Sequence, residues 1–196
     1  MPAPSSTIIE EISYHCHADP SCATAYFYFD FHNTDTTPLV VLRSLTKQLS
    51  LQCSNSILDA LAKLFLENAE GHRSPTPEAL MSTIRSIIGN FRNVYIVFDT
   101  LDECLERAEM IALLTEIHNW ELSTLHLLVT SRKERDIEES LKSLVSHQAP
   151  MDESVIDSDI RVYVSKTLNN DVKLKMCSLR EKQMIEAALI DGAHGM

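Results

Sequence analysis

The chain has 196 residues, of which 44% are hydrophobic, and its formal net charge at pH 7 is −11. A chain of this length can bury one substantial core, whereas its acidic excess would repel nucleic acid and anionic membranes, so we expect neither as a partner. The five cysteines follow no disulfide spacing and no apolar run is long enough to cross a bilayer, which predicts a reduced, cytoplasmic protein.

The first half of the chain mixes helical and strand patterns. Aromatic residues crowd one short segment and predict a strand there, whereas isoleucines and leucines elsewhere recur at helical spacing. Thr7 with Glu10 fits a capping box, and Thr37-Pro38 fits a helix start. The predicted elements are a helix over 7–17, a strand over 23–31, a helix from 37 to 49, a helix over 56–70, a polar loop over 71–77 and a helix from 78 to 88.

The second half predicts two further strands joined by a helix, and then helices alone. Crossovers long enough for helices between strands are typical of a parallel sheet. We therefore expect an α/β fold, in which a parallel sheet is flanked by helices and followed by a small helical segment. The predicted elements are strands over 94–98 and 125–129, and helices over 105–119, 135–144, 158–168 and 178–189; residues 145–150 are ambiguous.

Acidic residues begin where the apolar strand over 94–98 ends. Asp99, Asp102 and Glu103 would lie at the carboxyl edge of the sheet, where open α/β folds bind ligands. The segment resembles the Walker B strand of nucleotide-hydrolysing proteins. The alternative is an acidic loop that caps the helix beginning near Leu105, since carboxylates are favourable at a helix N-terminus.

No segment matches the phosphate-binding loop that should accompany a Walker B strand. Such a loop needs closely spaced glycines followed by Lys and Ser or Thr. The four glycines stand at positions 71, 89, 192 and 195, and the first lysine is Lys47. We therefore assign no cofactor-binding residues.

Two other kinds of chemistry are weighed and set aside. The histidines and cysteines at positions 15, 16, 17 and 22 match no standard zinc spacing. Cys104 has no histidine partner marked in the sequence, and neighbouring acids disfavour a thiolate, so we interpret it as structural.

Three segments, in the same order, resemble the NACHT domain of the STAND-type P-loop NTPases, in particular fungal proteins similar to the amino-terminal part of nephrocystin-3. Ala25–Phe31 resembles the second strand of the family, Val94–Cys104 its Walker B segment, and Leu127–Arg132 the next strand and sensor arginine. The resemblance implies that the expected sheet is an incomplete P-loop NTPase-like parallel sheet. It further implies a partial NACHT nucleotide-binding domain over 5–150 and the start of a helical lid over 151–196.

The resemblance also implies roles for the acids. Asp99 would hold Mg²⁺, Glu103 or Asp102 would activate water, and Arg132 would sense the γ-phosphate of ATP. Because the family's first helix directly follows its P-loop, the resemblance implies truncation before Ser5, with the first strand and Walker A missing. That strand is central in the family's sheet order, 5-1-4-3-2.

We therefore expect a truncated signalling module whose site residues are vestigial. It would have no ATPase activity and no cofactor of its own, whereas intact family members use ATP and Mg²⁺. It would act through homotypic contacts with other NACHT proteins. The alternatives are an ATP-binding or ATP-hydrolysing domain of a signalling protein, an inactive gene fragment, and for Arg132 a merely exposed side chain in a charged run.

Overall fold

The computed structural model describes residues 4–32, 36–53, 58–68, 72–149, 153–170 and 178–193. The chain divides into two compact units, one formed by residues 2–144 and the other by residues 145–196. The first unit contains a sheet with helices, and the second contains helices only in its described part. Each unit is described by itself.

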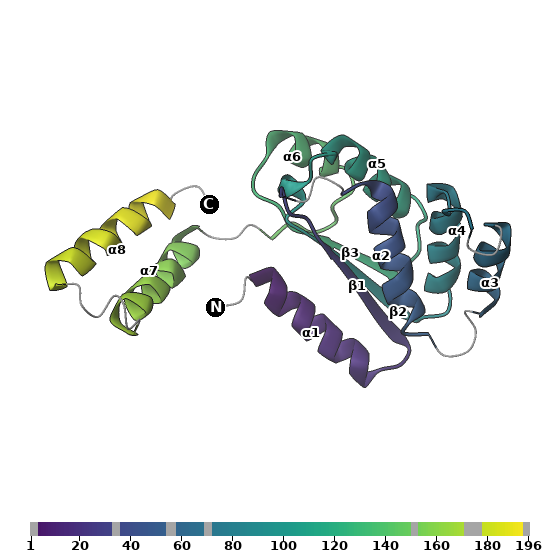
Figure 1. Ribbon diagram of the computed structural model, residues 1–196, viewed down its shortest axis with the longest axis horizontal. Helices are drawn as coiled ribbons and strands as arrows, with labels where there is room; N and C mark the ends of the chain where they lie inside the picture. Colours follow the sequence, from purple (N-terminus) through teal and green to yellow (C-terminus); the bar gives the residue numbers. More distant parts are fainter. Residues whose placement is uncertain are drawn as a thin grey trace. The chain divides into compact units, whose positions relative to one another are not determined.

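A parallel sheet forms the centre of the first unit (Figure 1). Its strands are β1 (Cys22–Tyr28), β2 (Asn93–Asp99) and β3 (Leu125–Val129), and they lie side by side in chain order. The predicted α/β fold with a P-loop-like parallel sheet is therefore confirmed. The described strands lie side by side without a gap, and among the described residues β3 has a strand partner on one side only. In the order 5-1-4-3-2 the missing first strand would lie next to β3, so its absence stays a prediction.

The middle strand is the most deeply buried. Val94, Ile96, Val97 and Phe98 of β2 are all fully buried. A strand that is covered on both faces is expected to be a continuous apolar run, because side chains of alternate residues point to opposite faces. The apolar run that predicted this strand therefore reflects its central position.

Helices cover both faces of the sheet. Figure 1 shows α1 (Pro4–Ala18) on one face and α2 (Pro38–Ser50) with α4 (Pro77–Ile88) on the other. α2 packs against both β1 and α4. The remaining helices of this unit are α3 (Leu58–Glu67), which packs against α4, and α5 (Arg107–His118) and α6 (Arg135–Leu141), which pack against each other.

Leucines and isoleucines of α2 and α4 supply much of the core. Both helices begin with a threonine N-cap followed by proline, as predicted for the first of them. Thr37 accepts a hydrogen bond from the backbone N–H of Val40 at 3.4 Å, and Thr76 accepts one from Ala79 at 3.3 Å. These caps satisfy backbone donors that the helix itself leaves without partners.

Several predicted boundaries differ from the observed ones, and the ends of the helix predicted over 56–70 lie outside the described residues. Two of the differences have a clear cause. α1 begins at Pro4, so Thr7 lies inside the helix and the predicted capping box does not form its start. β1 ends at Tyr28 instead of residue 31, because the Asp30 carboxylate accepts the backbone N–H of His32 at 2.9 Å and turns the chain there. Aromatic residues thus continue past the end of the strand.

The described part of the second unit consists of two helices that pack against each other, α7 (Glu153–Asn170) and α8 (Leu179–Ala193). α7 contains the helix predicted over 158–168, and α8 contains the helix predicted over 178–189 except for its first residue, Ser178. Among the described residues of this unit, Leu168 is the apolar residue that is buried. No helix in the described parts of the chain is long and apolar enough to span a membrane.

Candidate functional site

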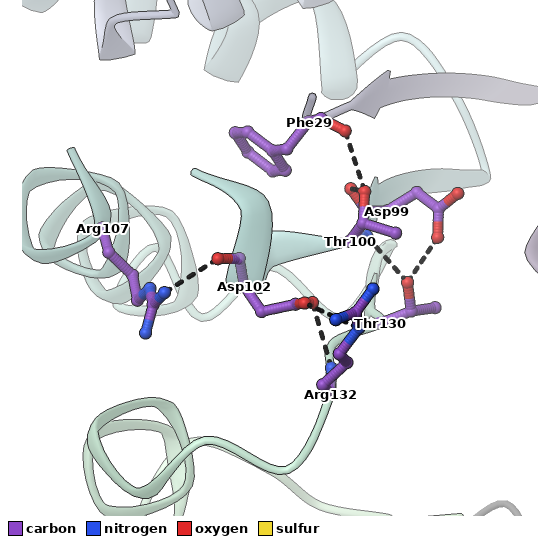
Figure 2. A network of polar contacts seen from close by, with 7 residues as sticks. All are labelled: Phe29, Asp99, Thr100, Asp102, Arg107, Thr130 and Arg132. Atoms are coloured by element: carbon purple, nitrogen blue, oxygen red, sulfur yellow. Dashed lines mark hydrogen bonds and ion pairs between the residues drawn. The ribbon is translucent and has the colours of Figure 1, made fainter. Parts of the chain in front are cut away.

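The candidate site lies where β2 and β3 end (Figure 2). Asp99 is the last residue of β2 and is only 5% exposed. The register pairs Phe98 with Val129, which places Asp99 beside Thr130. The Thr130 hydroxyl donates a hydrogen bond to the Asp99 carboxylate. One carboxylate oxygen of the predicted magnesium ligand is therefore bound to a protein hydroxyl.

Thr100 joins the ends of the three strands. Its φ of 57° and ψ of 50° lie in the left-handed region, which is unusual for a β-branched residue. Its backbone N–H donates to Thr130 Oγ1 at 3.0 Å, and its hydroxyl donates to the carbonyl of Phe29 at 2.9 Å. The strained backbone is held by contacts to both neighbouring strands, a situation that is common at functional sites.

Asp102 and Arg132 bind each other across the site. Asp102 lies in a short 3₁₀ helix, Leu101–Glu103, and its side chain is 8% exposed. Its carboxylate accepts the backbone N–H of Arg132 at 3.0 Å, and its other oxygen lies 3.5 Å from Arg132 Nε. The Arg132 side chain is 58% exposed. The acid therefore anchors the loop that follows β3.

Arg107 connects this site to α6. It is the first residue of α5, and its guanidinium donates to the backbone carbonyl of Asp102 at 2.8 Å. The same guanidinium contacts both carboxylate oxygens of Asp136, at 3.0 and 3.1 Å. Partial desolvation acts to raise the pKa of Asp136, but the hydrogen bonds and charge of Arg107 outweigh it and hold that pKa below its usual value.

Glu103 differs from its neighbours. Glu103 is half-buried, and its side chain makes no hydrogen bond or ion pair with any other described residue. Asp99 and Asp102, in contrast, both bind protein donors. Of the three predicted acids, Glu103 is thus the one whose carboxylate is uncommitted within the described structure.

The structure brings the predicted site residues to one edge of the sheet (Figure 2). The acids that follow β2 do not cap α5, because its N-cap residue is Glu106, whose side chain makes no capping hydrogen bond. Asp102 turns instead towards Arg132. Among the described residues no acid side chain caps α5, and Arg132, which the alternative expected to be an exposed side chain in a charged run, is 58% exposed. The assigned roles in metal binding, water activation and phosphate sensing stay predictions.

The described residues do not by themselves form a metal site. Nowhere in the described ranges do three His, Cys, Asp or Glu side chains gather closely enough to hold an ion. Asp99 also shares an oxygen with Thr130. Gly89 ends α4 and takes no part in a loop near Asp99. We therefore derive no chemical step through Mg²⁺ or ATP.

Cys104 is a buried thiol next to the site. Burial raises its pKa above the usual value, and the negative charge of Glu106 adds to the effect. The sequence predicted that Asp102 and Glu103 would disfavour the thiolate, but in the structure the acid that does so is Glu106. A protonated, buried thiol is a poor nucleophile. The geometry thus agrees with a structural role.

Sequence reasoning missed Thr100, Thr130 and Arg107 as site residues. Thr130 follows β3 directly, and parallel strands that end together bring such residues beside the acid at the end of the next strand. A hydroxyl one residue past a predicted strand end could therefore have indicated this contact. Arg107 carried no comparable signal, because its partners depend on how α5 meets α6.

These features define a class: an α/β module with a P-loop-like parallel sheet and a buried aspartate at the end of its middle strand. A family model described as Nephrocystin 3, N-terminal matches residues 4–132, which is more than half of the chain. The chain therefore belongs to this NACHT-like family. A search of the curated proteins and a search of the solved structures each found no match.

Proposed function

We propose that this chain is a NACHT-type module of a signalling protein of the STAND class, which acts through contacts with related NACHT proteins and does not hydrolyse ATP by itself. The observation that carries the proposal is the pair formed by Asp102 and Arg132. In the mechanism implied by the resemblance, an acid here activates water and an arginine here senses phosphate. In this chain the two groups neutralise each other.

Electrostatics at the same edge support the proposal. Arg107 and Arg132 are the arginines of the network in Figure 2, and both are bound to acids. A nucleotide polyphosphate is strongly anionic and requires backbone donors and free cations to offset its charge. The sequence contains no glycine-rich loop to supply those donors. Asp99 and Glu103 would therefore repel the phosphates more than this edge attracts them.

Exposed aromatic side chains support a function in protein contact. Tyr14 of α1 is 78% exposed, and Tyr26 and Tyr28 of β1 are 38% and 46% exposed. They line a shallow cavity of about 730 Å³ together with Ile9 and His17. Aromatic residues are enriched at protein interfaces because they bury a large area at little entropic cost. We assign the contacts with related NACHT modules to this surface.

The test combines turnover with binding. We expect the purified chain to release phosphate from Mg-ATP at the same background rate as its Glu103→Gln variant. We also expect it to bind a NACHT module of the same family in a light-scattering or interferometry assay, and Tyr14→Ser with Tyr28→Ser to weaken that binding at least about tenfold. Binding that these substitutions leave unchanged would refute the assigned surface.

The second candidate function is an ATP-binding or ATP-hydrolysing domain, and the uncommitted carboxylate of Glu103 favours it. A group free to orient water is what hydrolysis requires at this edge. Turnover that disappears in the Glu103→Gln variant would establish this alternative and contradict the leading proposal. An unchanged background would count against it.

A further inference from the structure

The outer edge of β1 is closed by two side chains, one at the end of α2 and one in the turn that follows it. Among the described strands, β1 pairs with β2 alone, on one of its two sides. An unpaired strand edge presents backbone N–H and C=O groups that can pair with a strand of another molecule. In this chain Gln48 and Gln52 occupy those groups on β1.

Each glutamine binds both backbone groups of one strand residue. The backbone N–H of Thr24 donates to Gln52 Oε1 at 3.0 Å, and Gln52 Nε2 donates to the Thr24 carbonyl at 2.6 Å. Gln48 repeats the arrangement on Tyr26, with distances of 3.0 and 2.8 Å. The backbone N–H of Cys22, the next residue of this edge, donates to the carbonyl of Asp19 at 2.9 Å.

The spacing of helix and strand makes the repetition possible. Residues four apart in a helix advance about 6 Å along its axis. Residues two apart in a strand advance about 6.6 Å and point their backbone groups to the same edge. Gln48 lies in the last turn of α2, and Gln52 lies four residues further on, in the turn that follows the C-cap Leu51, where its backbone N–H donates to the Leu49 carbonyl and continues the helical winding. Tyr26 and Thr24 are two apart, and α2 runs antiparallel to β1. The two glutamines therefore reach successive outward-facing residues of the strand.

A primary amide is the side-chain group that suits this position. It presents one acceptor and two donors, as a peptide group presents one acceptor and one donor. The second N–H of Gln48 lies 3.1 Å from Ser44 Oγ, and that of Gln52 lies 2.9 Å from the Gln48 carbonyl. These extra bonds fix the orientation of both amides. A carboxylate would repel the strand carbonyl, and an ammonium could not accept the N–H.

We infer that Gln48 and Gln52 form an amide clamp that closes the outer edge of β1 against pairing with a strand from a second copy of this chain. The clamp puts two side chains where a further strand could otherwise pair. Opening it would expose the N–H and C=O groups of Thr24 and Tyr26 beside exposed tyrosine side chains. The edge would then be able to pair with the same edge of another copy.

The test removes the amides and keeps the side-chain length. In the Gln48→Met/Gln52→Met variant of the full chain, we expect amide hydrogen exchange at Thr24 and Tyr26 to become at least about tenfold faster at low protein concentration. The Ala25 amide, which lies between them in β1, should keep its protection. At higher concentration, light scattering after size-exclusion chromatography should show dimers or larger species.

Gln183→Met is the matched control, because Gln183 is exposed on α8 and its side chain makes no hydrogen bond with any described residue. It should leave both exchange and mass unchanged. If the double variant does not fold, the single variants decide: Gln52→Met should release Thr24 alone and Gln48→Met should release Tyr26 alone. Unchanged exchange at these two amides would overturn the clamp, and a folded double variant that stays monomeric would overturn its protective role.

Discussion

At the scale of single residues, Thr100 combines an unfavourable backbone conformation with favourable contacts. Its left-handed φ of 57° costs about 1 kcal/mol or more for a β-branched residue. Its hydroxyl offsets part of that cost by binding the carbonyl of Phe29. The two terms can be separated, because glycine relieves the backbone whereas alanine does not.

We predict that Thr100→Ala lowers the free energy of unfolding by about 1–2 kcal/mol, since the hydroxyl is lost and the strain remains. Thr100→Gly should stay within about 1 kcal/mol of the unmodified chain, because relief of strain compensates for the lost hydrogen bond. Urea denaturation of both variants measures the difference. An alanine variant more stable than the glycine variant would refute the account of strain.

Asp102 and Arg132 form an unequal pair. The Asp102 side chain is nearly buried and accepts a backbone donor, whereas the guanidinium of Arg132 is largely in water. We predict that Asp102→Ala costs about 1–3 kcal/mol of stability, because the Arg132 N–H loses its acceptor. Arg132→Ala should cost less than about 1 kcal/mol, since its backbone N–H still donates. Equal losses in thermal or chemical unfolding would contradict this asymmetry.

The sequence predicted which residues lie at the site, but it did not predict which of them bind each other. The acids after β2 and the arginine after β3 were identified from the order of strand and charge. The bond between Asp102 and Arg132 joins residues thirty positions apart and depends on the register of β2 with β3. The periodicity of apolar residues predicts which face of a strand is buried, but it does not predict which residues of the neighbouring strand they pair with.

At the scale of elements, the Arg107–Asp136 pair ties the start of α5 to α6. Arg107 lowers the pKa of Asp136 from its ordinary value of 3.8 in the folded chain. A lowered folded-state pKa means that the pair stabilises the fold above the unfolded-state value, and that this stabilisation disappears as the pH falls through the folded-state value.

We therefore predict that Asp136→Asn is less stable than the unmodified chain at pH 6. The difference should shrink as the pH falls below about 4, because the acid of the unmodified chain then becomes protonated as well. Urea denaturation of both proteins at a series of pH values measures this difference in the free energy of unfolding. Since Asp136 is exposed, the effect should be small and should weaken in high salt. A difference that grows towards acid pH would contradict the assignment.

Element bounds show where sequence patterns are sufficient. The strand over 125–129 was predicted with its observed bounds, because a short apolar run ends there at polar residues. The start of α1 was misplaced because the capping-box pattern at Thr7 competed with a proline at position 4, and the proline marks the true first turn. Helix starts with two competing signals require the tertiary structure to decide between them.

At the scale of the whole molecule, family membership rests on residues 4–132, which lie within the first compact unit. The α/β class followed from the alternation of strands and helices. The commitment of the acids to protein partners could not follow, since it depends on how loops at the sheet edge fold over one another. The proposal that this edge does not hold nucleotide was already expected from the sequence, which has no glycine-rich loop, and the contacts of Asp99 and Asp102 with protein groups support it.

Thermal unfolding with and without millimolar Mg-ATP tests this central claim most directly, because a ligand that binds the folded state alone must raise the transition temperature. The chain should unfold cooperatively at a temperature that Mg-ATP leaves unchanged, and Asp99→Asn should respond in the same way. A transition temperature that rises with Mg-ATP in the unmodified chain and not in Asp99→Asn would contradict the claim and identify a working nucleotide site.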